Sequence, residues 1–217
     1  MQKYGASPKS VGYLVSTWAK FERDAVHRYL HNLRGTLLDV GCGIGFISAA
    51  LSSQFRVVGL DISEELLKFC PRSGFLPIAG SAFRLPFRDD TFDMILCTNV
   101  LQQFDYESGV GLFRELVRVA NLDGGILMTV RNGNSLVRHL SEPIFQLLNI
   151  ACLTDGLPLF GYEAKTISQE MALLGCKEEF VGYLFPPFRL QMGQYGRYLG
   201  TTTLLTYRKM EDLRFEN

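Results

Sequence analysis

The sequence of 217 residues has no excess of charge of either sign, and it contains only three histidines. Its 22 Lys and Arg residues balance 22 Asp and Glu residues. Proteins that bind nucleic acid carry clustered basic residues that contact phosphates. We find no such stripe, so we expect no nucleic-acid partner. None of the histidines stands in a recognisable motif, so the sequence offers no histidine general base and no metal site.

The sequence also lacks paired cysteines and long apolar runs. Its five cysteines are scattered and form no C-x-x-C pair: Cys42, Cys70, Cys97, Cys152 and Cys176. This pattern predicts reduced, buried thiols rather than a zinc site or a disulfide framework. The first residues contain no apolar signal core, and no run is long enough to cross a bilayer. We therefore expect a cytoplasmic protein without a transmembrane segment.

A glycine-rich stretch directly follows a short apolar segment near the start of the chain. Residues 36–40 can form a buried strand, three glycines alternate over residues 41–45, and residues 46–51 are predicted to continue as a helix. Glycine accepts positive φ and has no Cβ to keep a ligand away from the backbone. Asp39 stands at the carboxyl end of the strand, where open α/β sheets bind ligands. We interpret the stretch as a ligand-binding turn, because a bare turn seldom needs three alternating glycines.

The spacing of these glycines distinguishes between ligands. Dinucleotide-binding enzymes require G-x-G-x-x-G, and here Phe46 stands where the third glycine would be. The carboxylate of Asp39 would repel a pyrophosphate but suits an amine-bearing or cationic ligand. A second predicted strand, residues 56–61, ends at Asp61, where an acid can accept both ribose hydroxyls of a nucleoside. Asp61 therefore supports nucleoside binding, but it does not distinguish a dinucleotide-binding enzyme from an enzyme that binds another nucleoside.

Four motifs occur in the order found in class I S-adenosylmethionine-dependent methyltransferases. Residues 39–45 resemble motif I, Asp/Glu-x-Gly-x-Gly-x-Gly, and residues 80–87 resemble Gly-Asp-Ala-x-x-Leu-Pro-Phe. Residues 98–104 resemble the Asn-x-Leu-His-His stretch. A helix and then residues 121–125 resemble the Arg-Val-Leu-Lys-Pro-Gly-Gly signature. The chain resembles this family nearly element by element from residue 37 to residue 130.

The resemblance implies a single α/β domain over residues 1–217. Its fold would be three-layer and Rossmann-like, with a seven-stranded, mainly parallel sheet and an antiparallel last strand. The expected parts are an N-terminal helical cap (1–34), a cofactor-binding half (35–131), a lid insertion (132–165), and a C-terminal helix and strand pair (166–217). In the last part, Thr166 and Gln169 form a capping-box pattern that predicts a helix ending at Gly175.

The resemblance also implies S-adenosylmethionine as cofactor and S-adenosylhomocysteine as its product. Asp39 and the glycine turn would hold the amino-acid part, and Asp61 would hold the ribose. The other residues expected at the cofactor are Gly41, Cys42, Gly43, Gly45, Ile62, Ser81, Ala82, Phe83, Asn99, Leu101 and Tyr13. Ile62 and residues 81–83 would contact the adenine, and Asn99 and Leu101 the methionine end through their backbone. Tyr13 or Trp18 would close over the cofactor, unless their segment only covers an edge of the sheet.

Two departures from the family's pattern bear on activity. Ser81 stands where the family has an acid, so a hydroxyl without charge would contact the adenine. Gln102 and Gln103 stand where the family has two histidines, and an amide cannot serve as a general base. Gln103 would orient the substrate or simply form a polar turn. The other candidates for acceptor contact are Tyr162, Tyr183 and Arg189, beside an aromatic-rich insertion that could equally be loop packing.

The expected function is methyl transfer from S-adenosylmethionine to a small-molecule acceptor. A lipid or quinone-like acceptor fits the apolar stretch of residues 144–153. Two alternatives stay open. One is a nicotinamide-dependent oxidoreductase, which the glycine spacing disfavours. The other is a non-catalytic member of the fold that acts through a protein partner, which Ser81 and the two glutamines allow.

Overall fold

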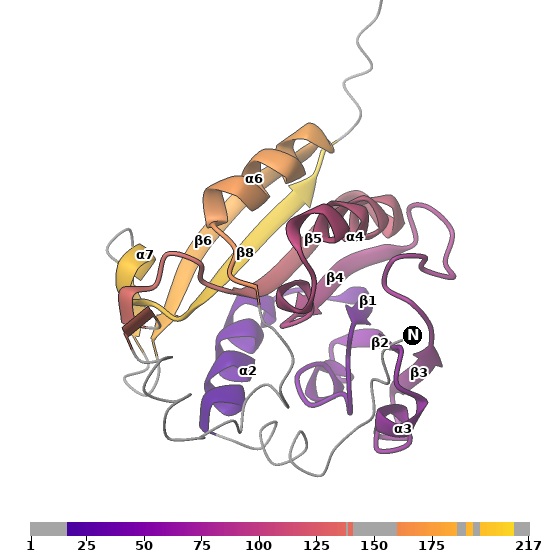
Figure 1. Ribbon diagram of the computed structural model, residues 1–217. Helices are drawn as coiled ribbons and strands as arrows, with labels where there is room; N and C mark the ends of the chain where they lie inside the picture. The colour runs from indigo at the N-terminus through magenta and orange to yellow at the C-terminus, as the bar shows by residue number, and fades with distance from the viewer. Residues whose placement is uncertain (1–16, 138, 141–159, 186–189, 193–195, 211–217) are drawn as a thin grey trace, which may run out of the picture.

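The computed structural model describes residues 17–137, 139–140, 160–185, 190–192 and 196–210, and these form a twisted sheet covered by helices on both faces (Figure 1). The strand order is β3-β2-β1-β4-β5-β8-β6-β7. The strands are β1 (Gly35–Val40), β2 (Phe55–Asp61), β3 (Phe75–Ala79), β4 (Phe92–Thr98), β5 (Ala120–Arg131), β6 (Cys176–Phe185), β7 (Leu190–Met192) and β8 (Thr202–Lys209). Strands β1 to β5 are parallel, and β8 runs antiparallel to β5 and β6.

The α/β fold with a mainly parallel sheet is therefore confirmed, and so is the antiparallel last strand, β8. The sheet has one strand more than expected. The three-residue strand β7 pairs antiparallel with β6 at the outer edge, within the predicted aromatic insertion. This edge lies far from the glycine turn in the strand order, so the extra strand does not alter the candidate site.

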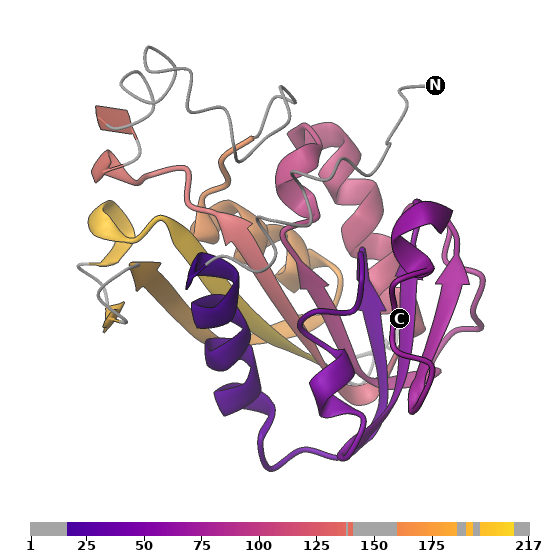
Figure 2. The same ribbon diagram turned by 90° about the horizontal axis from the view of Figure 1, so that it is seen from below.

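Helices cover the two faces of the sheet in separate layers (Figures 1 and 2). Helix α2 (Thr17–Leu30) and the 3-10 helix η1 (Ala49–Leu51) lie on one face. Helices α4 (Tyr106–Val119) and α6 (Ala164–Leu173) lie on the other. The remaining short helices are α3 (Glu64–Leu67), η2 (Leu101–Gln103) and α7 (Gly196–Leu199).

Two hydrophobic cores follow from the alternation of side chains along the central strands. On β1, Leu37 packs in the core beneath α2, whereas Leu38 packs in the core beneath α4. Both side chains are fully buried. A strand buried on both faces needs an almost continuous apolar sequence, which is why residues 37–40 contain a single polar residue, Asp39.

Two local predictions are wrong. Residues 46–51 form turns followed by η1 rather than a regular helix, so the glycine turn does not lead into a helix N-terminus that could supply a dipole. Helix α6 begins at Ala164, and its N-cap Glu163 makes no side-chain cap bond. Thr166 therefore lies inside the helix and caps nothing. The predicted end of this helix holds, because Gly175 follows its last turn with φ +81°.

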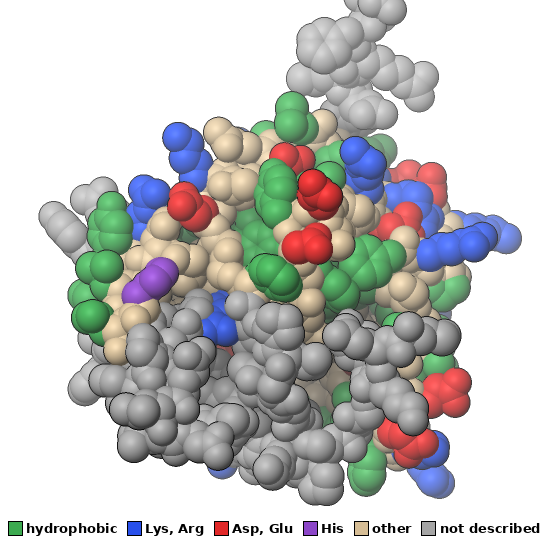
Figure 3. Space-filling view, viewed as in Figure 1, with side chains coloured by type: hydrophobic (Ala, Val, Ile, Leu, Met, Phe, Trp, Pro, Cys, Tyr) green, Lys and Arg blue, Asp and Glu red, His purple; other side chains and the backbone are tan. Residues whose placement is uncertain are grey.

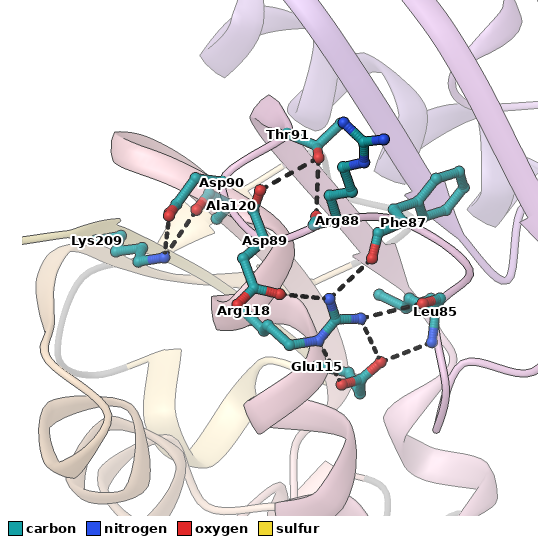
Figure 4. A network of polar contacts seen from close by, with 10 residues as sticks. All are labelled: Leu85, Phe87, Arg88, Asp89, Asp90, Thr91, Glu115, Arg118, Ala120 and Lys209. Atoms are coloured by element: carbon teal, nitrogen blue, oxygen red, sulfur yellow. Dashed lines mark hydrogen bonds and ion pairs between the residues drawn. The ribbon is translucent and has the colours of Figure 1, made fainter.

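A polar network fixes the loop between β3 and β4 onto α4 (Figure 4). The guanidinium of Arg118 donates two hydrogen bonds of 2.8 Å to the Glu115 carboxylate and one of 2.8 Å to Asp89. It also donates to the carbonyl oxygens of Leu85 (3.0 Å) and Phe87 (2.8 Å). Glu115 in turn accepts a hydrogen bond of 2.6 Å from the backbone N–H of Leu85. This network anchors the loop that carries the residues predicted to contact adenine.

Candidate functional site

Asp39 is a buried acid with one unsatisfied oxygen at the carboxyl end of β1. It is 1% exposed, and its Oδ2 accepts a hydrogen bond of 2.5 Å from the Ser48 hydroxyl. Within the described part of the chain, Oδ1 has no hydrogen-bond partner. Burial raises the pKa of Asp39 to about 7, the Ser48 bond lowers it, and the nearby charge of Asp61 raises it further. An isolated buried carboxylate is costly, so this arrangement suits a ligand that brings positive charge or a donor.

The glycine turn follows Asp39 and is tied to the neighbouring strand. The N–H groups of Gly41 and Cys42 both donate to the carbonyl of Leu60, at 2.7 and 3.0 Å. Gly41 has φ +73°, and a Cβ there would lie 2.2 Å from Val100 Cγ2, so only glycine fits. Gly43 has φ +54°, and a Cβ there would meet nothing closer than Leu66 Cδ1 at 4.0 Å. The turn therefore leaves open space at Gly43, where a ligand could approach the backbone.

The other glycine-turn candidates have packing roles in the structure. A Cβ on Gly45 would lie 3.2 Å from the ring of Phe75, and its φ is +75°. Cys42 is 9% exposed, and burial raises the pKa of its thiol far above the usual range. A ligand would therefore contact Cys42 through its backbone and not through a reactive thiolate.

Asp61 ends β2, immediately beside the turn. Its Oδ2 accepts a hydrogen bond of 2.8 Å from Gly43 N, and its Oδ1 accepts one of 2.8 Å from Ser63 N. The same carboxylate thus shapes the turn and starts α3, where Ser63 is the N-cap. The side chain is 9% exposed. Each carboxylate oxygen accepts one of these bonds and has capacity for a second, which ribose hydroxyls can donate.

The residues expected at the adenine present apolar surface beyond β2 and β3. Ile62 is 61% exposed and Phe83 is 39% exposed, both high for large hydrophobic side chains. The ring of Phe83 packs edge-on against Phe104, with centroids 4.7 Å apart. Ser81 Oγ accepts a hydrogen bond of 3.3 Å from Phe83 N, and Ala82 packs against the core. The Ser81 oxygen is thus partly used within its own turn.

Asn99 follows β4 in an unusual conformation and contacts an acid that sequence reasoning missed. It has φ +59°, and its Nδ2 donates a hydrogen bond of 2.6 Å to Glu22 Oε2. Glu22 lies on α2 and is 2% exposed. Burial raises the pKa of Glu22, while the Thr129 hydroxyl and the Asn99 amide lower it. Glu22 could have been found from its helical spacing, since it lies four residues before the fully buried Val26 on α2.

The remaining candidates near β4 have mixed environments. Leu101 is fully buried in η2, which leaves only its backbone for contact with a ligand. Gln103 is exposed, and its Nε2 donates to Asn99 O at 3.3 Å. The Gln103 amide therefore supports Asn99, which follows β4, and it still faces solvent.

Two of the acceptor candidates are buried in packing positions. The Tyr162 hydroxyl lies 2.8 Å from Phe104 O and 2.9 Å from Asp105 O, and the residue is 4% exposed. Tyr183 lies on β6 between β8 and β7 and is 8% exposed. Neither is brought beside Asp39 or Asp61 by a contact in the described residues. Tyr13 and Arg189 lie outside the described residues, as does most of the predicted lid.

The sequence was compared with models of known protein families. Residues 38–128 match the family model described as a methyltransferase domain. Residues 38–128 of this chain therefore resemble a methyltransferase domain. The resemblance to class I S-adenosylmethionine-dependent methyltransferases is thereby confirmed.

Named relatives share this domain over part of their length. The malonyl-[acyl-carrier protein] O-methyltransferase of Legionella pneumophila is 31% identical over 111 residues, 47% of this chain and 38% of that protein. The tRNA (carboxymethyluridine(34)-5-O)-methyltransferase of Arabidopsis thaliana is 35% identical over 95 residues, 43% of this chain and 23% of that protein. The demethylmenaquinone methyltransferase of Shouchella clausii is 29% identical over 154 residues, 63% and 62% of the two chains. The chain thus spans less than two thirds of the length of these relatives.

Solved structures share the fold of this methyltransferase domain at low sequence identity. Magnesium protoporphyrin IX methyltransferase from Synechocystis, solved with bound S-adenosylhomocysteine, has a TM-score of 0.65 and 18% identity over 95% of this chain and 90% of that one. A putative methyltransferase in a complex with the Haloferax volcanii Trm112 activator has a TM-score of 0.68 and 15% identity over 94% and 96%.

Three features of the described residues bear on possible partners: surface charge, membrane spanning and metal binding. On the face drawn in Figure 3, Lys and Arg side chains lie intermixed with Asp and Glu side chains. Within the described residues, no helix combines the length and the apolar character needed to cross a bilayer. In the same part of the chain, no three His, Cys, Asp or Glu side chains are grouped so that they could hold a metal ion.

Proposed function

We propose that this domain transfers a methyl group from S-adenosylmethionine to a small-molecule acceptor. The observation that carries the proposal is Asp39, a buried acid with an unpartnered oxygen, beside a glycine turn that leaves open space at Gly43. A buried carboxylate gains most from a positively charged partner. The amino group of the cofactor's methionine part supplies such a partner.

The order of the candidate contacts along the sheet supports this assignment. The adjacent strands run β3-β2-β1-β4. Ser81 follows β3, Asp61 ends β2, Asp39 lies near the end of β1 and Asn99 follows β4. Adenine, ribose, amino acid and sulfur end of the cofactor can be placed along this row. The chemistry of each residue suits the part assigned to it, because Asp61 can accept ribose hydroxyls and Asp39 can accept an ammonium group.

The cofactor, when bound, supplies an electrophilic methyl group on a positively charged sulfur. The residues of this chain therefore need to bind, orient and exclude water rather than activate the methyl group. Asp39 and the backbone of residues 41–45 would bind the amino-acid part, and Asp61 would fix the ribose. The exposed side chains of Ile62 and Phe83 would shield the adenine from water.

Calorimetric titration with S-adenosylhomocysteine and with NADH tests the cofactor. We expect binding of S-adenosylhomocysteine at micromolar concentration and none of NADH; the reverse result would support the oxidoreductase. An acceptor screen then uses methyl-labelled S-adenosylmethionine with demethylmenaquinone, malonyl-[acyl-carrier protein] and tRNA, the acceptors named for the relatives above. Label in a small molecule supports the proposal, and label in tRNA alone would contradict its small-molecule part.

A non-catalytic role through a protein partner is the second candidate. The loss of the two family histidines at Gln102 and Gln103 favours it, because an amide cannot accept the acceptor's proton. This candidate predicts binding of S-adenosylhomocysteine without methyl transfer to any acceptor in the screen. The choice between this candidate and an active methyltransferase therefore depends on whether another group of this chain can take the acceptor's proton.

A further inference from the structure

Ser48 donates the hydrogen bond that holds the buried carboxylate of Asp39. Its hydroxyl lies 2.5 Å from Asp39 Oδ2, a distance typical of a charge-assisted bond between a hydroxyl and a carboxylate. Ser48 is fully buried and Asp39 is 1% exposed, so water does not replace this bond. In the part of the chain that the structure describes, Asp39 Oδ1 has no partner. The bond from Ser48 therefore decides which of the two oxygens stays available to a ligand.

The backbone donors of the glycine turn beside Asp39 are engaged elsewhere. The N–H groups of residues 41 and 42 both bind a carbonyl oxygen of β2. The N–H of Gly43 binds Asp61 Oδ2 at 2.8 Å. Among the described residues, Ser48 is the only donor that bonds the Asp39 carboxylate. The orientation of this acid thus depends on one hydroxyl.

A purely local role of Ser48 predicts a different contact. Ser48 occupies the N-cap position of η1, where a serine hydroxyl ordinarily accepts a hydrogen bond from the backbone of its own helix. It makes no such cap bond. Its hydroxyl instead bonds Asp39, nine residues earlier in the chain. The side chain therefore serves the acid and not the short helix that it precedes.

Helix α2 holds the segment that carries Ser48. His27 Nε2 lies 2.7 Å from Ile47 O. The guanidinium of Arg23 lies 5.2 Å from the centroid of the Phe46 ring. These contacts hold the two residues directly before Ser48, so its hydroxyl has a defined place beside the end of β1.

We propose that Ser48 is a positioning residue of the cofactor site: its hydroxyl fixes one oxygen of Asp39, keeps the carboxylate charged, and leaves the other oxygen for the ammonium group of the cofactor's methionine part. This inference rests on the proposed function, which assigns that ammonium group to Asp39. A hydroxyl that donates to a carboxylate stabilises the ionised form, and it does so more strongly where water is excluded. Only the ionised form attracts the ammonium group by its charge.

The groups that face Asp39 set its response to pH. Among the described residues, they are the carboxylate of Asp61 and the thiols of Cys42, Cys70 and Cys97. Burial raises the pKa of each of these thiols, so the thiols stay uncharged near neutral pH. Burial raises the pKa of Asp39 to about 7, the bond from Ser48 lowers it, and the charge of Asp61 raises it. Loss of the Ser48 hydroxyl should therefore raise the pKa of Asp39 further.

The pH dependence of ligand affinity tests this role. S-adenosylhomocysteine carries the same ammonium group, and calorimetric titration measures its dissociation constant without an acceptor. The affinity of the wild type should fall about tenfold from pH 8 to pH 6, because Asp39 must lose a proton to bind the ligand. A charge-assisted hydrogen bond changes a pKa by about one. The variant Ser48→Ala should therefore bind about ninefold more weakly than the wild type at pH 6 but less than about twofold more weakly at pH 8.

The control is Ser52→Ala, which makes the same substitution at the other end of η1, where the residue is exposed. It should bind as the wild type does at both pH values. Glu22 is unchanged in all three proteins, so its own ionisation cancels in the comparison. If Ser48→Ala loses no affinity, or loses the same factor at pH 6 and pH 8, the positioning role is overturned, because a merely structural loss does not follow the charge of Asp39. Failure of the wild type to bind S-adenosylhomocysteine at pH 8 would instead overturn the proposed function.

A second variant covers the case in which Ser48→Ala does not fold. Ser48→Cys keeps a side chain of similar shape and replaces the hydroxyl with a thiol, which is a weak donor. It should also weaken binding more at pH 6 than at pH 8, by smaller factors than those expected for Ser48→Ala. A pH dependence equal to that of the wild type would overturn the inference in this variant as well.

Discussion

The ionisation of Asp39 should make the stability of this protein fall as pH rises, opposite to the usual behaviour of a carboxylate. Burial holds the pKa of Asp39 at about 7 in the folded state, against 3.8 when it is exposed to water. Between these values the folded protein binds more protons than the unfolded chain. The stabilising difference is complete below pH 3.8 and is lost progressively as pH rises through about 7.

The size of the effect follows from the distance between the two pKa values. At 1.36 kcal/mol for each pKa unit, the difference between 3.8 and about 7 corresponds to about 4 kcal/mol. More than half of this falls between about pH 5 and about pH 8, where the protein can be studied. Asp39→Asn cannot ionise, so its stability should gain on the wild type by that amount over the same pH range. Buried Glu22 is present in both proteins, and its contribution cancels in the difference.

Urea unfolding at several pH values measures this difference, and the sign can be controlled within the same protein. Hydrogen bonds from Thr36 N, Thr36 Oγ1 and Asn121 Nδ2 lower the pKa of Asp93. Asp93→Asn should therefore lose stability relative to the wild type as pH rises toward the unfolded pKa of aspartate, and the difference should stay constant above that pKa. If the stability difference between Asp39→Asn and the wild type does not change with pH, the buried and unsatisfied state of Asp39 is refuted.

Three further substitutions test the site and its support. Asp61→Ala should weaken binding of S-adenosylhomocysteine by about 1–3 kcal/mol in a titration; because Asp61 also accepts from Gly43 N and Ser63 N, the turn should loosen as well, and unchanged affinity would contradict the ribose role. Gly43→Ala should lower stability by only about 1–2 kcal/mol, because of its positive φ, and should lower ligand affinity at least about tenfold. Gly41→Ala, whose Cβ would lie 2.2 Å from Val100, should unfold at a clearly lower urea concentration. Equal behaviour of the two variants would contradict the open space at Gly43. Arg118→Ala should lower stability by about 2 kcal/mol and expose residues 80–91 to proteolysis, while the exposed Arg114→Ala on the same helix should do neither.

The sequence predicted those parts of the fold that depend on short-range patterns. Apolar runs located β1, β2 and β4, and the glycines with Asp39 and Asp61 located the edge of the sheet where ligands bind. The helix predicted after the turn does not form as a regular helix: its backbone bonds mix Ala49 N to Gly45 O with the shorter-range Leu51 N to Ser48 O, and Ile47 O also lies 2.7 Å from His27 Nε2. Helical spacing in a short apolar segment could not reveal that outcome.

Glu22 shows most clearly what the order of residues along the chain conceals. It lies 77 residues from its partner Asn99 in sequence, on a helix that reads as an amphipathic cover for the sheet. The acid becomes notable only when the structure shows that α2 packs beneath β4 and β5 and that Asn99 and Thr129 hold the carboxylate there. The contact between Glu22 and Asn99 therefore joins α2 to the end of β4, and helical spacing alone cannot predict such a long-range contact.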